Sequence, residues 1–103
     1  MIIEQIRYWT GADVEPLLDA RRRLSRVRRE QGLPPGHILL ADEAPSESPC
    51  LVWQCGYGDE GEMGMVETRL IGDAEYEEAR AQLGELSERV EVELYLTDPE
   101  SEE

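Results

Sequence analysis

The sequence has no lysine, no asparagine and no phenylalanine, and all ten of its basic residues are arginine. It also has little that binds metal: two cysteines, Cys50 and Cys55, and one histidine, His37. No second cysteine pair or histidine cluster is present to complete a zinc site, so we expect no metal and no cofactor. The two cysteines lie five residues apart in one predicted strand, which should point them to opposite faces and prevent a disulfide.

Long apolar runs are missing as well. No segment approaches the length of a membrane-spanning helix, and the N-terminus lacks the basic and apolar regions of a secretory signal. We therefore expect a cytoplasmic protein that does not enter a membrane, with its cysteines reduced. The length of 103 residues suits a single domain, which we place at residues 1–97 and follow with an acidic, disordered tail at 98–103.

Positive charge is scarce, and it is unevenly distributed. Residues 1–58 carry 8 acids and 7 arginines, a net charge of −1, whereas residues 59–103 carry 16 acids and 3 arginines, a net charge of −13. The total of −14 repels nucleic acids and anionic membranes. We therefore expect neither as a partner.

The arginines gather at residues 21–29, in a segment whose apolar residues have helical spacing. Arg22, Arg26 and Arg29 should lie opposite the apolar stripe, while Arg21 and Arg28 should flank it. We interpret the cluster as a solvated helix face, with Asp19 pairing with Arg22 or Arg23 and Glu30 with Arg26.

Hydrophobic periodicity predicts the remaining elements. Strands are expected at residues 1–9, 37–42, 50–57 and 90–97. Asp13 should cap the first helix and Gly32 should end it, and Asp73 should cap a later helix. The expected core stripes are Val14, Leu17, Ala20, Leu24 and Val27 on the first helix, and Tyr76, Ala79, Leu83, Leu86 and Val90 on the later one.

Residues 60–71 fit two patterns. As a helix, they place Met63, Val66 and Leu70 on one side, whereas as a strand their alternation is mixed. We favour the helix, which makes the second helical region a pair of helices separated at Gly72.

The order β-α-β-β-α-β, with a split second helix, predicts an α+β, ferredoxin-like fold with a four-stranded antiparallel sheet. Its helices would cover one sheet face and leave the other bare. Both faces of the first and third strands carry apolar residues, so the bare face needs a cover. A second copy of the chain is the simplest one.

The segment from Met63 to Leu96, with the step Gly72-Asp-Ala-Glu-Tyr76, resembles the C-terminal half of NIPSNAP-type proteins in the dimeric α/β-barrel superfamily. The start Met1-Ile-Ile-Glu-Gln-Ile-Arg7 is similar to the first strand of that family. The resemblance, which extends to antibiotic-biosynthesis-monooxygenase-like members, implies a homodimer whose sheets pack into a barrel. Such proteins include cofactor-independent monooxygenases, haem-degrading enzymes and lactone isomerases. No complete catalytic set from any of them can be placed on this sequence.

One stretch suggests a nucleotide site. Gly56, Gly58 and Gly61 have the G-x-G-x-x-G spacing of a dinucleotide loop. The stretch follows the third strand of an antiparallel fold, however, and Asp59 and Glu60 would repel a pyrophosphate. We interpret these glycines as the exit from a strand into a helix.

Polar residues on otherwise apolar strands are the better indication of a ligand pocket. Their residue types suit an organic ligand, with Arg7 as an anion or carbonyl anchor. The alternative is that Arg7 forms a structural cross-strand pair with Glu91 or Glu93. His37 is the only side chain that ordinarily titrates near neutral pH, although a structural or surface role is the alternative for it. The predicted pocket residues are Arg7, Trp9, His37, Gln54, Glu93 and Tyr95.

These observations lead to two hypotheses about function. In the first, the protein is a homodimer that binds a small organic molecule, and its enzymatic form would be a cofactor-independent oxygenase or isomerase. In the second, it is a non-catalytic ligand sensor or a dimeric interaction module. The sequence leaves open whether the protein is an enzyme.

Overall fold

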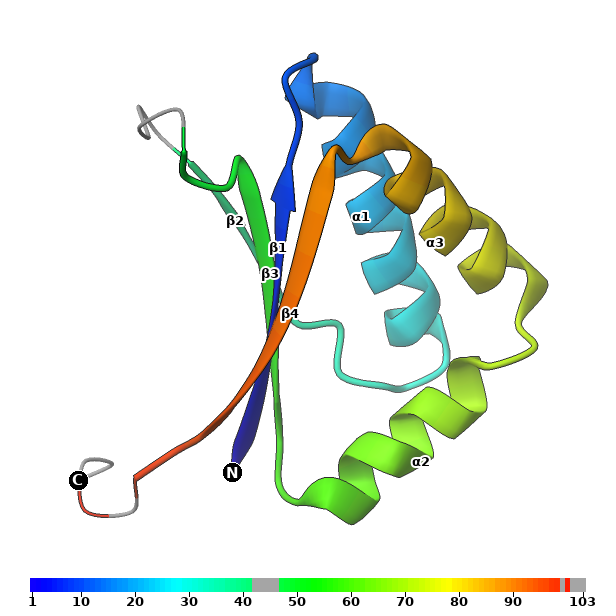
Figure 1. Ribbon diagram of the computed structural model, residues 1–103. Coiled ribbons are helices and arrows are strands. Elements are labelled where there is room, and N and C mark those ends of the chain that lie inside the picture. The colour runs from blue at the N-terminus through cyan, green and yellow to red at the C-terminus, as the bar shows by residue number, and fades with distance from the viewer. Residues whose placement is uncertain (42–46, 99, 101–103) are drawn as a thin grey trace.

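The computed structural model describes residues 1–41, 47–98 and 100 of the chain. Four strands form one antiparallel sheet in the order β2-β3-β1-β4, and the three helices lie on one side of it (Figure 1). The predicted ferredoxin-like fold with a split second helix is thereby confirmed. The elements are β1 (Ile2–Trp9), α1 (Val14–Glu30), β2 (His37–Leu40), β3 (Leu51–Tyr57), α2 (Glu60–Leu70), α3 (Ala74–Leu86) and β4 (Arg89–Leu96).

The second strand was expected at residues 37–42, but it ends at Leu40, and Asp42 lies outside the described residues. The disordered tail was placed at residues 98–103. Of these positions the structure describes only Asp98 and Glu100, where the Glu100 amide donates to Asp98 Oδ1 at 3.0 Å.

Each helix begins after an aspartate whose side chain accepts a hydrogen bond from the first turn. Asp13 accepts from the amide of Glu15, Asp59 from Glu62 and Asp73 from Tyr76. Such caps satisfy amides that have no partner within the helix and place a negative charge at its positive end. The predicted caps at Asp13 and Asp73 are confirmed.

The glycine-rich loop leads directly into α2, as the sequence indicated. Asp59 Oδ1 accepts from the Glu62 amide at 2.8 Å, and Glu62 Oε2 accepts from the Gly58 amide at 2.7 Å. The amides of Gly58 and Glu62, at the start of α2, are therefore occupied by carboxylates of the same chain. This pair of capping hydrogen bonds, which resembles a capping box shifted by one residue, explains the loop without a phosphate.

The two C-terminal helices are separated at Gly72, whose positive φ of 89° is a conformation that glycine adopts readily. Residues 60–71 form the predicted helix as far as Leu70. One detail of the next helix was wrong, because its stripe was extended to Val90. The helix ends at Leu86, the Glu88 amide donates to the Trp9 carbonyl, and Val90 pairs with Tyr8 in the sheet.

The core lies between the sheet and the helices. Alternate residues of β1 and β3 point towards α1, α2 and α3, and the residues predicted as apolar stripes on the helices meet them there. The largest of these side chains is Trp53, which is 1% exposed. The principal buried residues are Tyr8, Leu17, Leu24, Val27, Leu51, Trp53, Cys55, Tyr57, Val66, Leu70, Ala79 and Leu83.

The opposite face of the sheet has no helix on it (Figure 1). Strand register aligns its residues in rows, with Gln5 between Gln54 and Glu93, and Arg7 between Val52 and Glu91. We call this surface the bare face. It consists of Ile3, Gln5, Arg7, Trp9, His37, Leu39, Val52, Gln54, Gly56, Arg89, Glu91, Glu93 and Tyr95.

Both cysteines are free, as expected. Cys55 is buried in β3, whereas Cys50 precedes that strand and packs partly against the core, so the predicted opposition of the two across one strand was wrong. Among the described residues, no helix combines the length and the apolar character needed to cross a membrane.

Candidate functional site

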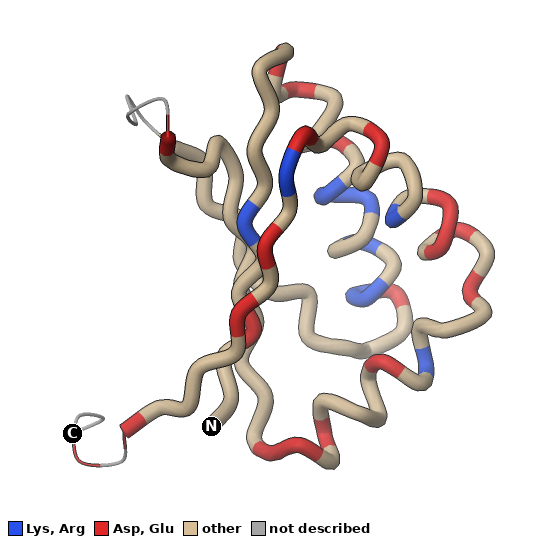
Figure 2. The backbone as a smooth tube through the Cα atoms, viewed as in Figure 1, with Lys and Arg blue, Asp and Glu red and all other residues tan. Residues whose placement is uncertain are grey.

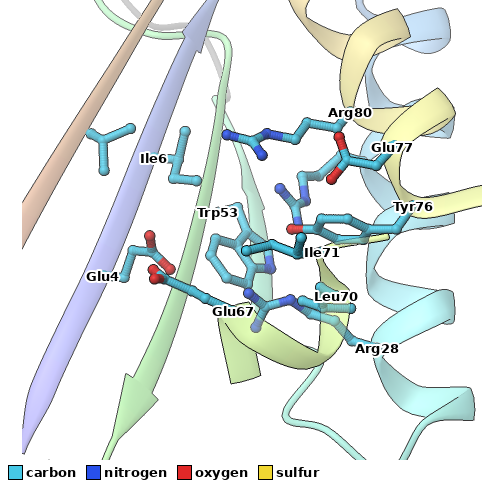
Figure 3. Close-up of a pocket in the computed structure, with 12 residues that line it drawn as sticks. Glu4, Ile6, Arg28, Trp53, Glu67, Leu70, Ile71, Tyr76, Glu77 and Arg80 are labelled. Atoms are coloured by element: carbon cyan, nitrogen blue, oxygen red, sulfur yellow. The ribbon is translucent and has the colours of Figure 1, made fainter. Parts of the chain in front are cut away.

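A cavity of about 370 Å³ lies between the sheet and the helices, on the side opposite the bare face (Figure 3). Every element except β2 contributes to its walls. The lining residues are Glu4, Ile6, Arg21, Arg28, Trp53, Glu67, Leu70, Ile71, Tyr76, Glu77, Arg80 and Val92.

Two arginines of α1 are the unusual feature of this cavity. Arg21 and Arg28 are 2% and 3% exposed, although arginine is rarely buried to this extent. Their guanidinium carbons lie 4.3 Å and 4.5 Å from the ring centroid of Trp53, within the range of cation–π attraction. Two positive charges therefore share one aromatic side chain inside the protein.

These arginines are buried because they continue the apolar stripe of α1. Arg21 follows Leu17 by four residues, Leu24 follows three residues later, and Arg28 follows four residues after that, so all four lie on the inner side of the helix. The two arginines were predicted to lie beside the stripe, within a solvated cluster, and for them that interpretation was wrong. Their spacing from the leucines was the signal that could have revealed their burial.

The hydrogen-bond partners of the buried arginines are uncharged. Arg21 Nη1 donates to the Tyr8 hydroxyl at 3.1 Å, and Arg28 donates through Nη1 and Nη2 to the Tyr57 hydroxyl at 3.1 Å and 3.2 Å. Arg28 Nη1 also donates to the Pro34 carbonyl at 3.1 Å. Nε and Nη2 of Arg21 and Nε of Arg28 are buried and have no hydrogen-bond partner among the described residues.

The burial of these charges affects pKa values. Burial lowers the pKa of the Arg21 guanidinium, while its contact with Tyr8 acts in the opposite direction. Burial also acts to lower the pKa of Arg28, but the Tyr57 hydroxyl beside it outweighs this effect, and the pKa is raised. Burial raises the pKa of Tyr57, which keeps that hydroxyl neutral and able to donate to Glu4 Oε1 at 3.2 Å. No carboxylate among the described residues forms an ion pair with either arginine.

The rim of the cavity differs from its interior. Glu67, Glu77 and Arg80 are exposed, and the side chain of Tyr76 projects from α3 towards Trp53 (Figure 3). The helices leave β4 uncovered, so Val92 remains 57% exposed at the edge, and Ile71 is 70% exposed. The site therefore has a positively charged interior and a rim that is partly acidic and partly apolar.

The outer arginines of α1 behave as expected. Arg22 lies 3.7 Å from Asp19, and Arg26 lies 3.7 Å from Glu30. Arg26 and Arg23 also contact Glu75 of α3, at 2.7 Å and 3.5 Å, and these pairs link the two helices. The contrast between arginine-rich α1 and the acidic elements after Asp59 is visible in Figure 2.

The six predicted pocket residues all lie on the bare face, and four of them belong to one hydrogen-bonded chain. Gln5 joins Gln54 to Arg7, with Arg7 Nε donating to Gln5 Oε1 at 2.8 Å. Arg7 then contacts Glu93 at 3.0 Å and the Tyr95 hydroxyl at 2.7 Å, and Tyr95 donates to Glu93.

The other two predicted residues lie apart from this chain. Trp9 stacks under Arg89 at 4.4 Å and donates to the Glu47 carbonyl, while His37 begins the edge strand β2 opposite Gln54. The cross-strand pair predicted as the alternative is present, between Arg7 and Glu93. A ligand-binding role for the six residues stays a prediction.

The pair between Arg7 and Glu93 predicts a pH effect on stability. The hydrogen bond from Tyr95, followed by the charge of Arg7, lowers the pKa of Glu93. Because the pKa of Glu93 is lower in the folded protein than the usual glutamate value of about 4.3, its charged form stabilises the fold at pH values above about 4.3. This stability is lost as the pH falls through the lowered pKa. Glu93→Gln should therefore be less stable than the wild type at neutral pH and should lose less stability on acidification, as measured by urea unfolding across a pH series.

Glu85→Gln is the matched control for this effect, because Glu85 is an exposed acid of α3 that forms no ion pair with a described residue. It should follow the wild-type profile. If Glu93→Gln also follows that profile, the pair contributes nothing to stability.

No group of three or more histidine, cysteine, aspartate or glutamate side chains suited to a metal ion occurs in the described part of the chain.

The fold and the cavity can now be compared with known proteins. The chain matches no family model, and it matches no curated protein. A NIPSNAP family protein from Agrobacterium tumefaciens has a similar structure, with a TM-score of 0.72 and 17% identity over 95% of this chain and 85% of that one. The chain shares the fold of this protein. This match confirms the predicted resemblance at the level of fold.

Two further structures have a similar fold. A candidate antibiotic biosynthesis monooxygenase from Nitrosomonas europaea matches with a TM-score of 0.67 and 18% identity, over 94% of this chain and 98% of that one. A protein of unknown function from Bacteroides fragilis, described as dimeric and ferredoxin-like, matches with a TM-score of 0.58 and 12% identity, over 93% and 96% of the two chains.

Proposed function

We propose that the protein is a homodimeric small-molecule-binding protein, and that each subunit holds an organic ligand in the cavity between its sheet and its helices. The observation that carries this proposal is the cavity itself. Its volume of about 370 Å³ falls within the range of roughly 300–1,000 Å³ that is usual for ligand pockets. Its walls combine aromatic and aliphatic side chains with six charged residues, of which Arg21 and Arg28 are buried.

The buried arginines add a second argument. A buried charge without a counter-charge costs several kcal/mol, so folding alone gives little reason to keep Arg21 and Arg28 inside the protein. Residues that reduce stability in this way are typical of binding sites.

The bare face is the proposed dimer interface. Leu39 and Tyr95 are 48% and 41% exposed on this face, and Ile3 and Val52 are only half-buried there. Packing two copies face to face would remove these side chains from water and enclose the chain from Gln54 to Tyr95. The dimeric description of the similar Bacteroides fragilis protein supports this arrangement.

A cofactor-independent oxygenase or isomerase is the enzymatic form of the proposal. The similar protein described as a candidate monooxygenase supports it. The alternative is a non-catalytic ligand sensor or dimeric interaction module, for which ligand binding without turnover would be the signature.

A thermal-shift screen of aromatic and quinone-like compounds tests the proposal. A ligand that binds only the folded state should raise the melting temperature saturably, and at a hundred times its Kd it should add about 2.7 kcal/mol of stability. Absence of any saturable shift across a broad screen would contradict the proposal.

Arg7→Ala distinguishes the cavity from the predicted pocket on the bare face. If the ligand occupies the cavity, a compound found in the screen should stabilise this variant as much as it stabilises the wild type. Loss of the shift in a variant that still folds and dimerises would move the site to Arg7 and its neighbours.

A further inference from the structure

Arg21 has more unpaired donor nitrogens than Arg28. Arg28 bonds the Tyr57 hydroxyl with two nitrogens and the Pro34 carbonyl with one of them, so two of its three nitrogens are engaged. Arg21 uses Nη1 alone, for Tyr8. Its Nε and Nη2 remain without a hydrogen-bond partner although the residue is 2% exposed and lines the cavity.

These two nitrogens have a specific geometry. In a planar guanidinium, Nε and Nη2 lie on the same edge, and their hydrogens point in parallel. That edge matches the two oxygens of a carboxylate, or one anionic oxygen that accepts both hydrogen bonds. An unpaired edge of this kind, on a residue that lines a cavity, suits an anion supplied from outside the protein.

The acidic residues around the cavity do not supply an anionic partner for Arg21. The half-buried side chain of Glu4 accepts from Tyr57, and Glu67 and Glu77 are exposed at the rim with Arg80 (Figure 3). None of the three forms an ion pair with Arg21 or Arg28 among the described residues. The interior therefore keeps the charge of two guanidinium groups, while the acids lie nearer to water, where their charge is screened more strongly.

The walls indicate the shape of the ligand. Trp53 lies beside both guanidinium groups, Tyr76 faces it across the cavity, and Ile6 and Val92 supply aliphatic surface from the sheet. Flat aromatic and aliphatic surfaces favour a planar, conjugated group.

We propose that the ligand is a planar organic anion whose carboxylate, phenolate or enolate oxygen accepts hydrogen bonds from Nε and Nη2 of Arg21. This inference rests on the proposed function, because it specifies the ligand of the same cavity. An anion at this position gives the buried guanidinium the counter-charge that the chain itself does not supply, and the conjugated part of the ligand packs against Trp53.

Calorimetric titration of the full chain with three carboxylates and their amides tests the charge. Acetate, benzoate and 2-naphthoate increase in size, and acetamide, benzamide and 2-naphthamide keep the shapes without the charge. We expect at least one carboxylate to bind about tenfold or more tightly than its amide, as expected when a charged partner replaces a neutral one.

Arg21→Met and Arg22→Met form a matched pair of variants. Both remove one arginine charge from α1, but Arg22 is exposed and lies outside the cavity. Arg21→Met should lose about tenfold or more of the carboxylate affinity and should bind the carboxylate and its amide alike. Arg22→Met should keep the wild-type preference, and circular dichroism should show that both variants are folded.

Each outcome has one meaning. Equal binding of carboxylates and amides to the wild type would overturn the anion while keeping the ligand site. Binding of none of the six compounds at millimolar concentration, together with an empty thermal-shift screen, would overturn both proposals. A preference for carboxylates that survives in Arg21→Met, or in the equally neutral Arg21→Gln if the methionine variant does not fold, would show that Arg21 is not the contact.

Discussion

Replacing Trp53 with alanine is expected to lower the free energy of unfolding by about 3–5 kcal/mol, as large-to-small changes of buried aromatics do. The side chain is 1% exposed, its Nε1 donates to the Pro35 carbonyl at 2.9 Å, and both buried arginines stack on it. The change leaves a void and removes the aromatic surface next to two buried charges. Urea unfolding of the wild type and the variant measures the difference.

Trp53→Phe separates the two contributions of this side chain. It keeps most of the apolar volume but loses the hydrogen bond to Pro35 and part of the ring, so we expect a cost of about 1–2 kcal/mol. The neighbouring Gly36, with φ 74°, is fitted to the indole, since a Cβ there would lie 2.4 Å from Trp53 Nε1. A cost below about 1 kcal/mol for Trp53→Ala would show that the cavity region does not hold the fold together.

Val52→Arg is expected to convert the proposed dimer into a monomer. Val52 lies in the middle of the bare face, directly opposite Arg7 on one side and Leu39 on the other. In two sheets packed face to face, the new side chain would bring an unpaired positive charge next to Arg7 in each subunit. Like charges in an interface cost several kcal/mol, which corresponds to a hundredfold or larger change in affinity. Light scattering coupled to size-exclusion chromatography measures the mass.

Met65→Arg is the matched control for this experiment. Met65 is 54% exposed on α2, so the variant adds the same charge away from the bare face. It should remain a dimer. A wild-type protein that is already monomeric at micromolar concentration, or a dimer that tolerates Val52→Arg, would contradict the proposed interface.

Much of the fold followed from the sequence because its patterns are local. Alternation in residues 1–9 and 90–97, the helical stripe from Val14 to Val27 and the capping aspartates each involve neighbours a few residues apart. The failure at Val90 also has a local cause, since this residue continues both the 3-4 spacing of the preceding helix and the alternation of the strand. Only pairing with Tyr8 across the sheet decides between the two.

The candidate site was predicted less well, because charge was taken as a sign of exposure. Arg22 and Arg26 follow that rule, but Arg21 and Arg28 occupy inner positions of the same helix. Their stabilising partners are the hydroxyls of Tyr8 and Tyr57 and the ring of Trp53, which lie on strands β1 and β3. Contacts of this kind depend on tertiary packing and leave no pattern in the sequence.

The arrangement of residues on the bare face, in contrast to the burial of the two arginines, follows from the sequence. Alternation along each strand places Arg7 with Gln5 and Trp9, and Glu93 with Tyr95, on shared faces. The sheet register then aligned these faces, and the polar side chains form one hydrogen-bonded chain. The alternation of side chains along the strands indicates which residues share a face of the sheet. It could not show that the described cavity lies on the other side of the sheet.

A crystal structure of the protein grown with 4-iodobenzoate is the most direct test of the central claim, since the iodine can be located from its anomalous scattering. We expect an iodine position inside the cavity of each subunit, with the carboxylate on Nε and Nη2 of Arg21 and the ring beside Trp53. An iodine bound on the bare face near Arg7, or an empty cavity at saturating ligand, would contradict it.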